Sequence, residues 1–173
     1  MDALGLGLMA KNVGPGDAIF VPSFTFAATA EVVFWVGATL VFIDYLEDTY
    51  NMDPKSLDQG INQAKKLGLK PADIIPVDFF GQPADYNAIQ AIADEYGLWV
   101  MADGGQSFGA SYKGHKVGNI GDIVQQTFSR RNLLVATVMA VKYLPTVRAW
   151  QLLLNLYAYM GKDLISTTTC ALA

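Results

Sequence analysis

Up to residue 128, the sequence alternates between short, almost wholly apolar runs and longer stretches in which apolar residues recur at helical spacing. Apolar runs this short, separated by single helices, are typical of a parallel sheet that is covered by helices on both faces. The runs read AIFVPS, TLVFIDY, DIIPVDFFG, LWVMAD and DIVQQTF. We therefore expect a three-layer α/β fold with one mainly parallel, twisted sheet, and strands at Ile19–Pro22, Leu40–Asp44, Ile74–Val77 and Trp99–Ala102.

The helical stretches carry start and stop signals. They read ATAEVVFWVG, DPKSLDQGINQAKKLG and DYNAIQAIADEYG. In the second stretch, Asp53 is placed to cap the helix, Pro54 takes the first helical position and Gly68 follows the end. In the third stretch, Gly97 follows the last apolar position and predicts the helix stop. The right-handed crossover rule then places these helices on the two faces of the sheet.

The composition of the chain changes after Phe128. Fifteen of the 16 glycines and 15 of the 16 acidic residues precede Ser129. Regular alternation of strand, turn and helix also ends there, so we interpret residues 1–128 as part of one domain and residues 129–173 as a tail of different origin. The tail contains a long apolar stretch, but Lys142 and Arg148 lie inside it. Because a cation at the bilayer centre costs about 2.5–3.5 kcal/mol on insertion scales, we expect no membrane span.

Composition and charge exclude several classes of protein. The 173 residues, 52% of them hydrophobic, suffice for a core. The net charge of -4 and a pI near 4.8 leave no basic surface for a phosphate backbone, so we expect no nucleic-acid partner. Cys170 is the one cysteine, which excludes an internal disulfide and fits a reducing compartment. No signal-peptide pattern opens the sequence, so the expected location is the cytoplasm.

Ligands of an open parallel sheet bind beyond the carboxyl ends of its strands. The residues in such places are Ser23–Phe26, Asp44, Phe79–Gln82 and Asp103–Gln106. Asp103 is the most informative, because it ends a buried strand and precedes two glycines that permit close approach. A buried carboxylate needs a cation or a hydrogen-bond donor, and the protonated ring nitrogen of a cofactor would serve. Two plainer alternatives stay open: Asp103 caps a turn without any ligand, and Phe26 is a core aromatic.

Other candidate chemistry is weak. His115, the one histidine, lies in the polar turn YKGHKVG and is assigned no catalytic role. Gly104, Gly105 and Gly109 lack the G-x-G-x-x-G spacing of a phosphate loop. The sequence contains no cluster spaced for metal ligands and no G-x-S-x-G nucleophile motif, so we expect no metal site.

Four consecutive blocks together resemble one family. The blocks are GPGDAIFVPSFTFAATAEVV, VFIDYLEDTYNMDP, IIPVDFFGQPADYNAI and MADGGQSFGASYKGHKVGNIGD. In order and spacing they are similar to the DegT/DnrJ/StrS family of pyridoxal-phosphate-dependent sugar aminotransferases. The resemblance runs from Asp2 to Phe128 and implies part of the large domain of the aspartate aminotransferase-like fold, fold type I. It also implies pyridoxal 5'-phosphate as the cofactor.

The resemblance implies roles for five positions. Asp103 corresponds to the carboxylate that pairs with the pyridine nitrogen of the cofactor, which makes the ring an electron sink. Gln106 corresponds to a glutamine beside the ring, and Phe26 to the aromatic residue that stacks on it. Thr127 stands in place of a serine that contacts the cofactor phosphate. Asp2 belongs to the phosphate-binding block, which lacks its preceding serine/glycine-threonine pair here and is therefore incomplete.

The family's Schiff-base lysine is missing. It follows the phenylalanine block in a P-x-K-P-L-G context, whereas this chain reads Thr127-Phe128-Ser129-Arg130-Arg131-Asn132. The genetic code permits TTT TCC CGG CGA AAC CTC for the run from Phe128 to Leu133, and one T added to such codons gives codons for F-F-P-A-K-P. The lysine then falls where Asn132 stands. Later stretches of the tail permit further family motifs in the restored frame, and we interpret residues 129–173 as a frameshift product.

The function implied by the resemblance is transamination of a nucleotide-linked keto-sugar, in the synthesis of amino sugars or surface polysaccharides. Glutamate is the expected amino donor, and a homodimer is the expected assembly. The chain as written would be inactive, because it has no catalytic lysine. Two alternatives remain: a pyridoxal-dependent sugar dehydratase of the same family, in which histidine replaces the lysine, and a non-catalytic binding or regulatory relic.

Overall fold

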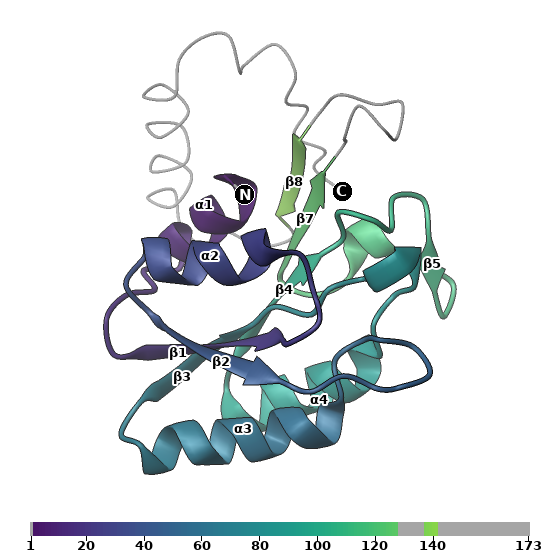
Figure 1. Cartoon of the computed structure of the whole chain (residues 1–173). Helices are drawn as coiled ribbons and strands as arrows, with labels where there is room; N and C mark the ends of the chain where they lie inside the picture. Colours follow the sequence, from purple (N-terminus) through teal and green to yellow (C-terminus); the bar gives the residue numbers. More distant parts are fainter. Residues whose placement is uncertain (1, 128–136, 142–173) are drawn as a thin grey trace, which may run out of the picture.

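The computed structural model describes residues 2–127 and 137–141 (Figure 1). Asn132 and most of the tail predicted from the sequence lie outside the described residues, as does most of the long apolar stretch around Lys142. In the described part of the chain, no helix has both the length and the apolar character that crossing a bilayer requires.

Six strands form one sheet. In spatial order they are β2 (Thr39–Ile43), β1 (Asp17–Pro22), β3 (Lys70–Ile74), β4 (Trp99–Asp103), β7 (Ile123–Thr127) and β8 (Thr137–Val141). Every pair among the first five is parallel, and β8 runs antiparallel to β7. The mainly parallel sheet expected from the sequence is therefore confirmed.

The strand expected at Ile74–Val77 begins and ends earlier than predicted. β3 starts at Lys70 and ends at Ile74. Pro76 has no N–H to continue the ladder, although its carbonyl still accepts from the backbone N–H of Asp103 at 2.8 Å. Only an isolated bridge between Val77 and Asp103 extends the pairing further. The chain thus leaves the sheet beside the end of β4, where the candidate site lies.

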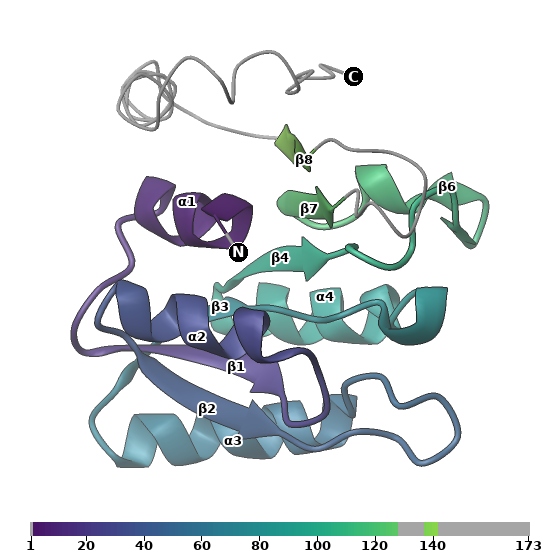
Figure 2. The same ribbon diagram turned by 45° about the horizontal axis from the view of Figure 1, so that its top comes forward.

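Helices cover both faces of the sheet and make three layers (Figure 2). Helices α1 (Asp2–Ala10) and α2 (Ala27–Trp35) lie on one face, and α3 (Pro54–Lys66) and α4 (Tyr86–Tyr96) on the other. Alternate residues of β1 belong to two separate hydrophobic cores. Ala18 and Phe20 pack on the α3/α4 side of the sheet, and Ile19 and Val21 pack on the α1/α2 side. All four are fully buried. This explains why the strand runs are apolar at every position.

The predicted helix signals act as expected. The Asp53 side chain accepts from the backbone N–H of Lys55 at 3.0 Å, and Pro54 opens α3. Gly97 follows α4 with a φ of 68°, a left-handed conformation that favours glycine. Helix α4 has a cap that the sequence analysis did not single out, because the Asp85 carboxylate accepts from the backbone N–H of Ala88 at 3.3 Å.

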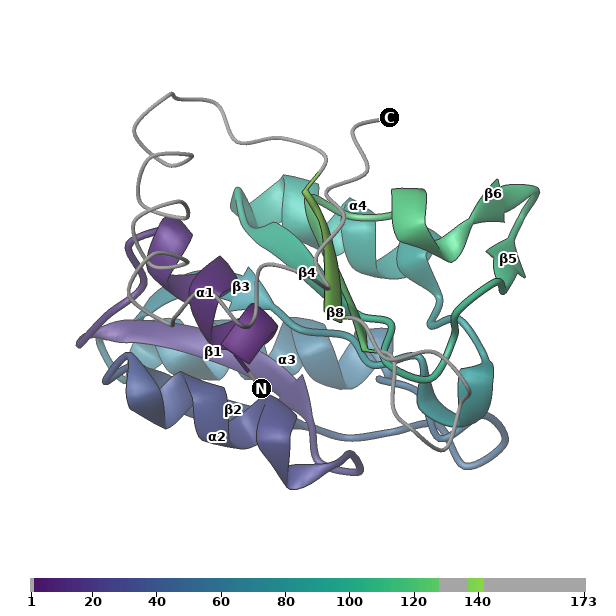
Figure 3. The same cartoon turned by 90° about the horizontal axis from the view of Figure 1, so that it is seen from above.

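Two further elements differ from expectation. A small antiparallel hairpin, β5 (Ser111–Tyr112) and β6 (His115–Lys116), forms where the sequence indicated only a polar turn. Figure 3 shows it well away from α1 and α2. The sequence shows no regular alternation of strand, turn and helix in the tail, yet residues 137–141 form strand β8. It pairs antiparallel with β7, because an open strand edge offers backbone hydrogen bonds to an extended segment.

Candidate functional site

The residues at the ends of β1 and β4 meet at one cavity of about 220 Å³. Phe26, Asp103 and Gln106 all line it, so the predicted convergence of these three is confirmed. They come together because parallel strands place their carboxyl ends on the same edge of the sheet. Leu4 of α1, Thr29 of α2 and Gln125 of β7 also line the cavity, together with Thr25 from the loop between β1 and α2.

Asp103 is held by two donors. The Thr29 hydroxyl donates to Oδ2 at 2.8 Å, and the backbone N–H of Gly105 donates to Oδ1 at 3.2 Å. Burial raises the pKa of Asp103, and these two hydrogen bonds act in the opposite direction. The contact with Gly105 means that Asp103 does cap a turn. Since each carboxylate oxygen has two acceptor positions, it can also accept a donor from a ligand in the cavity.

Phe26 is not a core residue. Its side chain lies just before α2, and 73% of its surface is exposed. Leaving a phenylalanine this open forgoes about 1.5–3 kcal/mol of burial. The core alternative for Phe26 is therefore wrong, and its ring is free to stack on a flat ligand.

Gln106 is oriented by the loop after β3. Its Oε1 accepts from the backbone N–H of Phe80 at 2.9 Å, which leaves the amide NH₂ as the group that can donate to a ligand. Phe80 has a φ of 54°, uncommon for a residue other than glycine. At the neighbouring Gly81, φ is 78° and an added Cβ would lie 3.2 Å from the carbonyl oxygen of Gln106. The loop and Gln106 are thus closely fitted.

Behind the cavity lies Asp78, which the sequence analysis did not single out. It is fully buried and accepts hydrogen bonds from the Ala84 N–H (3.0 Å), the Tyr86 hydroxyl (2.7 Å) and the Ser107 hydroxyl (2.5 Å). Burial raises the pKa of Asp78, and the three donors lower it. The network ties the loop after β3 and the start of α4 to the turn that follows Asp103. An acidic residue inside the apolar run IIPVDFF was the available signal.

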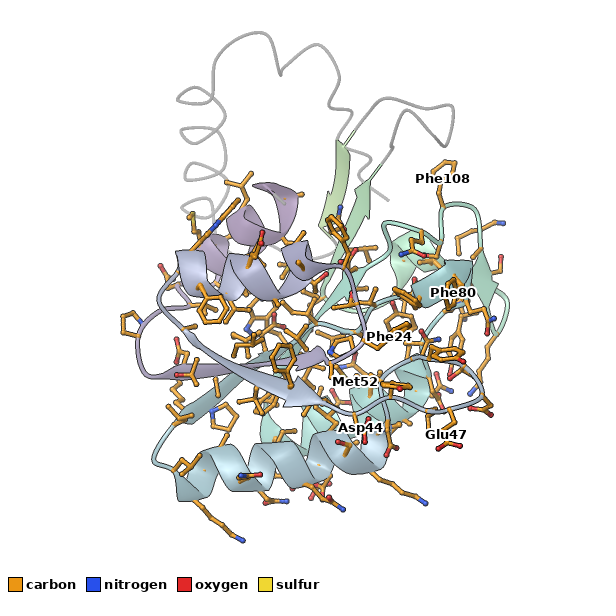
Figure 4. All side chains as sticks on the ribbon, viewed as in Figure 1. Phe24, Asp44, Glu47, Met52, Phe80 and Phe108 are labelled. Atoms are coloured by element: carbon orange, nitrogen blue, oxygen red, sulfur yellow. The ribbon has the colours of Figure 1, made fainter. Side chains whose placement is uncertain are left out.

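Exposed aromatic rings border this edge of the sheet. Phe24, Tyr45, Tyr50, Phe79 and Phe80 form a chain of ring contacts with centroid separations of 4.3–5.9 Å. We call these five residues the aromatic rim. Figure 4 shows Phe24 and Phe80 on the side where the loops after β1 and β3 run. Phe24, Tyr45, Tyr50 and Phe80 each expose more than a third of their surface. The rim makes one border of the site apolar.

The remaining predicted site residues are placed by their elements. Asp2 is the first residue of α1 and Thr127 the last of β7, and both elements also contribute residues to the cavity wall. Asn132 lies outside the described residues. Asp44 does not line the cavity. Its Oδ1 accepts a hydrogen bond from the backbone N–H of Tyr45 at 2.8 Å. Among the described residues, no group of three or more His, Cys, Asp or Glu could hold a metal ion.

A pyridine cofactor fits the side chains that surround the cavity. Asp103 offers a carboxylate to a protonated ring nitrogen, Gln106 offers an amide donor, and Phe26 offers an open ring face. The Thr25 hydroxyl also lines the cavity, is buried, and has no hydrogen-bond partner within the described chain. A buried hydroxyl without a partner costs about 1–3 kcal/mol, which a ligand could recover. A second hollow of about 600 Å³ lies between α4 and the hairpin β5–β6, and none of the predicted cofactor-binding residues lines it.

The fold and this arrangement are those of a large domain of a fold type I pyridoxal-phosphate enzyme. The chain belongs to the DegT/DnrJ/EryC1/StrS aminotransferase family, whose model matches residues 1–137. The family indicates pyridoxal 5'-phosphate as the cofactor.

Relatives of known name support this assignment. The chain is 46% identical over 127 residues to UDP-2-acetamido-2-deoxy-3-oxo-D-glucuronate aminotransferase of Pseudomonas aeruginosa, a match that covers 73% of this chain and 34% of that protein. It is 45% identical over 122 residues to UDP-N-acetyl-3-dehydro-alpha-D-glucosamine 3-aminotransferase of Acidithiobacillus ferrooxidans, covering 70% of this chain and 31% of that protein. The chain thus spans about a third of the length of these relatives.

Solved structures agree. A DegT DnrJ EryC1 StrS aminotransferase from Brucella abortus has a TM-score of 0.82 at 40% identity, covering 93% of this chain and 44% of that chain. A putative sugar aminotransferase from Streptococcus pneumoniae in its PLP form has a TM-score of 0.67 at 31% identity, covering 73% of this chain and 35% of that chain. The predicted family and fold class are confirmed.

Proposed function

We propose that this chain is part of a pyridoxal-phosphate-dependent aminotransferase that acts on a nucleotide-linked keto-sugar. One observation carries the proposal: Phe26, Asp103 and Gln106 line one cavity at the carboxyl edge of the sheet. The names of the relatives, which act on nucleotide-linked sugars, support the substrate class. Glutamate as amino donor and a cytoplasmic homodimer complete the proposal by resemblance to the family.

The bound cofactor would supply an electron sink for the carbon from which a proton is removed. Asp103 would accept a hydrogen bond from its ring nitrogen and keep that nitrogen protonated, because a partly buried carboxylate pairs strongly with a neighbouring cation. Phe26 would fix the plane of the ring, and Gln106 would donate to its polar edge. Asp2 and Thr127, at the ends of α1 and β7, are proposed to lie toward the phosphate.

The chain as written is proposed to be inactive, because Asn132 has no amine with which to hold the cofactor or move a proton. Other lysines are poor substitutes. Lys116 donates to the Gly109 carbonyl at 3.1 Å and Lys113 lies over the Tyr112 ring, both in the hairpin β5–β6. Neither lines the cavity. A catalytic group must be placed to within about 0.5 Å, so these lysines cannot replace the missing one.

The direct test compares the chain as written with a frame-restored, full-length version. Each is mixed with pyridoxal phosphate, reduced with borohydride and mapped by mass spectrometry. We expect no stoichiometric label on the unrepaired chain and one labelled lysine, at position 132, in the repaired protein. A single labelled lysine in the unrepaired chain would contradict the proposed loss of activity. Absence of label in the repaired protein would exclude the aminotransferase.

Sequencing the DNA across codons 127–133 separates the alternatives. A restored lysine codon favours the aminotransferase. A histidine codon there would favour the dehydratase. A verified in-frame Asn132 would favour a non-catalytic relic that keeps the sheet and the cavity. Amino-transfer assays with UDP-linked 3-keto-sugars, the substrates that the names of the two relatives suggest, then test the substrate class.

A further inference from the structure

Thr29 makes a contact that the proposed cofactor roles do not include. It lies in α2, is 1% exposed, and donates its hydroxyl to Asp103 Oδ2 at 2.8 Å. The two residues are 74 positions apart in sequence. The hydroxyl therefore reaches from the helix layer to the end of a central strand, at the carboxylate that faces the cavity.

This hydrogen bond determines how the Asp103 carboxylate is held. Its other oxygen accepts only a longer contact, 3.2 Å, from the Gly105 N–H in its own turn. A carboxylate rotates about its last bond unless both oxygens are fixed. Thr29 donates to Oδ2 and Gly105 to Oδ1, so the carboxylate is held in one orientation. The acceptor position that each oxygen still has free therefore points in a fixed direction.

We propose that Thr29 is a positioning residue for the cofactor carboxylate: its hydroxyl fixes the orientation of Asp103 and stabilises its ionised form. The inference rests on the proposed function, because the orientation matters only if Asp103 pairs with a ring nitrogen.

The hydrogen bond from the Thr29 hydroxyl opposes the effect of burial on the Asp103 carboxylate. Burial raises the pKa of Asp103, and among the hydrogen bonds that lower it the one from Thr29 is the larger. The charge of the N-terminus also lowers the pKa of Asp103. Asp78 and Tyr86 are buried titratable neighbours, and the charge of Asp103 raises the pKa of both. Asp78 has three donors of its own. Among the residues that the structure describes, Thr29 is the one side-chain donor to Asp103, so loss of Thr29 would leave the Asp103 anion markedly less stable.

The first test is made on the chain as written and needs no cofactor. The Asp103 carboxyl is titrated by carbon NMR, with its resonance assigned by its loss in D103N. Removing a hydrogen bond to a charged group should raise the titration midpoint by about one to two pH units in T29V. T29S keeps the donor and should remain close to the unsubstituted chain. T39V, the same change on an exposed residue of β2, should shift nothing.

The second test measures pyridoxamine 5'-phosphate binding, which requires no lysine. We expect about tenfold weaker binding in T29V, recovery in T29S and no effect of T39V. The thermal unfolding midpoint shows whether T29V is folded. If T29V is folded but leaves both the titration midpoint of Asp103 and the affinity for the probe unchanged, the inference is overturned. It is also overturned if T29S behaves like T29V. If the frame-restored, full-length protein binds the probe equally well with and without D103N while the Asp103 midpoint still shifts in T29V, the cofactor role of Asp103 fails and the hydrogen-bonding role of Thr29 stands.

Discussion

The backbone N–H of Asp78 donates to the carbonyl of Asp103 over 3.0 Å. The two carboxylates thus stand close together at the ends of adjacent chain segments, and the charge of Asp103 raises the pKa of Asp78. Only Asp103 lines the cavity. Asp78 does not line the cavity, and its oxygens accept hydrogen bonds from three groups of the protein. Asp78 therefore holds the loops together, whereas Asp103 faces a ligand.

Asp78→Asn should destabilise the fold. Asparagine keeps one acceptor oxygen but puts an NH₂ group in place of the other, and it lacks the negative charge that the three donors face; disruption of such a network costs about 2–4 kcal/mol. Urea unfolding measures the change. Asp94→Asn is the matched control, because Asp94 is exposed and accepts a single contact from Gln90; it should change stability by no more than about 0.5 kcal/mol. Equal effects of the two substitutions would refute the role of Asp78.

Stability should fall as pH rises above about 4, through Asp73. This carboxyl on β3 is fully buried, neither of its oxygens has a hydrogen-bond partner among the described residues, and burial raises its pKa well above the usual value. A group whose pKa is higher in the folded state stabilises the fold at pH values below its unfolded pKa. That contribution is lost as the pH rises through the folded pKa.

Asp73→Asn tests this directly. The variant should be more stable than the unsubstituted chain at pH 7 by about 1 kcal/mol or more, because it avoids a buried charge. The difference should shrink to nothing near pH 3. Urea unfolding at a series of pH values gives the profile. A constant difference between the two proteins across pH 3–8 would show that Asp73 does not titrate as inferred.

Phe26→Ala should weaken cofactor binding without unfolding the domain. The ring is 73% exposed, so its loss should change the free energy of unfolding by no more than about 0.5 kcal/mol. Loss of one stacking face should weaken pyridoxamine 5'-phosphate binding about fivefold to tenfold. Phe34→Ala, at a 65% exposed residue of α2 that does not line the cavity, is the control and should leave the affinity unchanged. Similar losses in both would count against stacking by Phe26.

Gly81→Ala should disturb both the loop and Gln106. The residue has a φ of 78°, and the new Cβ would lie 3.2 Å from the Gln106 carbonyl. Gly16→Ala is a control with a φ of 92° and nothing within 4 Å of the added Cβ. Both variants incur backbone strain of about 1–2 kcal/mol, but only the first should also weaken pyridoxamine 5'-phosphate binding. Unfolding and binding titrations together separate strain from contact.

Much of the fold could be predicted because its signals are local. Apolar runs mark strands that are buried on two faces, and Asp53, Pro54 and Gly97 mark helix ends through contacts within a few residues. The places of Asp103, Gln106 and Phe26 at one edge of the sheet could be predicted for a similar reason, since each lies at or shortly after a strand end, whereas their cofactor roles came from the family resemblance. The end of β3 was misplaced because the Pro76 carbonyl still pairs with β4 although the regular ladder has ended.

The rest depends on contacts between distant segments. Thr29 reads as an ordinary helical residue until α2 is packed against the end of β4. Asp78 was hidden in an apolar run because its three donors come from Ala84, Tyr86 and Ser107, up to 29 residues away. Strand β8 was not predicted, because residues 129–173 were interpreted as a tail outside the domain, whereas residues 137–141 pair with β7.

The aromatic rim gives ligands of this edge a calorimetric signature. Four of its five rings keep more than a third of their surface in water. A molecule that reaches over them removes apolar area from solvent, and its binding enthalpy should become more negative as temperature rises. A molecule that contacts only Asp103 and Gln106 removes mainly polar surface and should show little such slope. Titration calorimetry at several temperatures would thus report how far a bound ligand extends beyond the cavity.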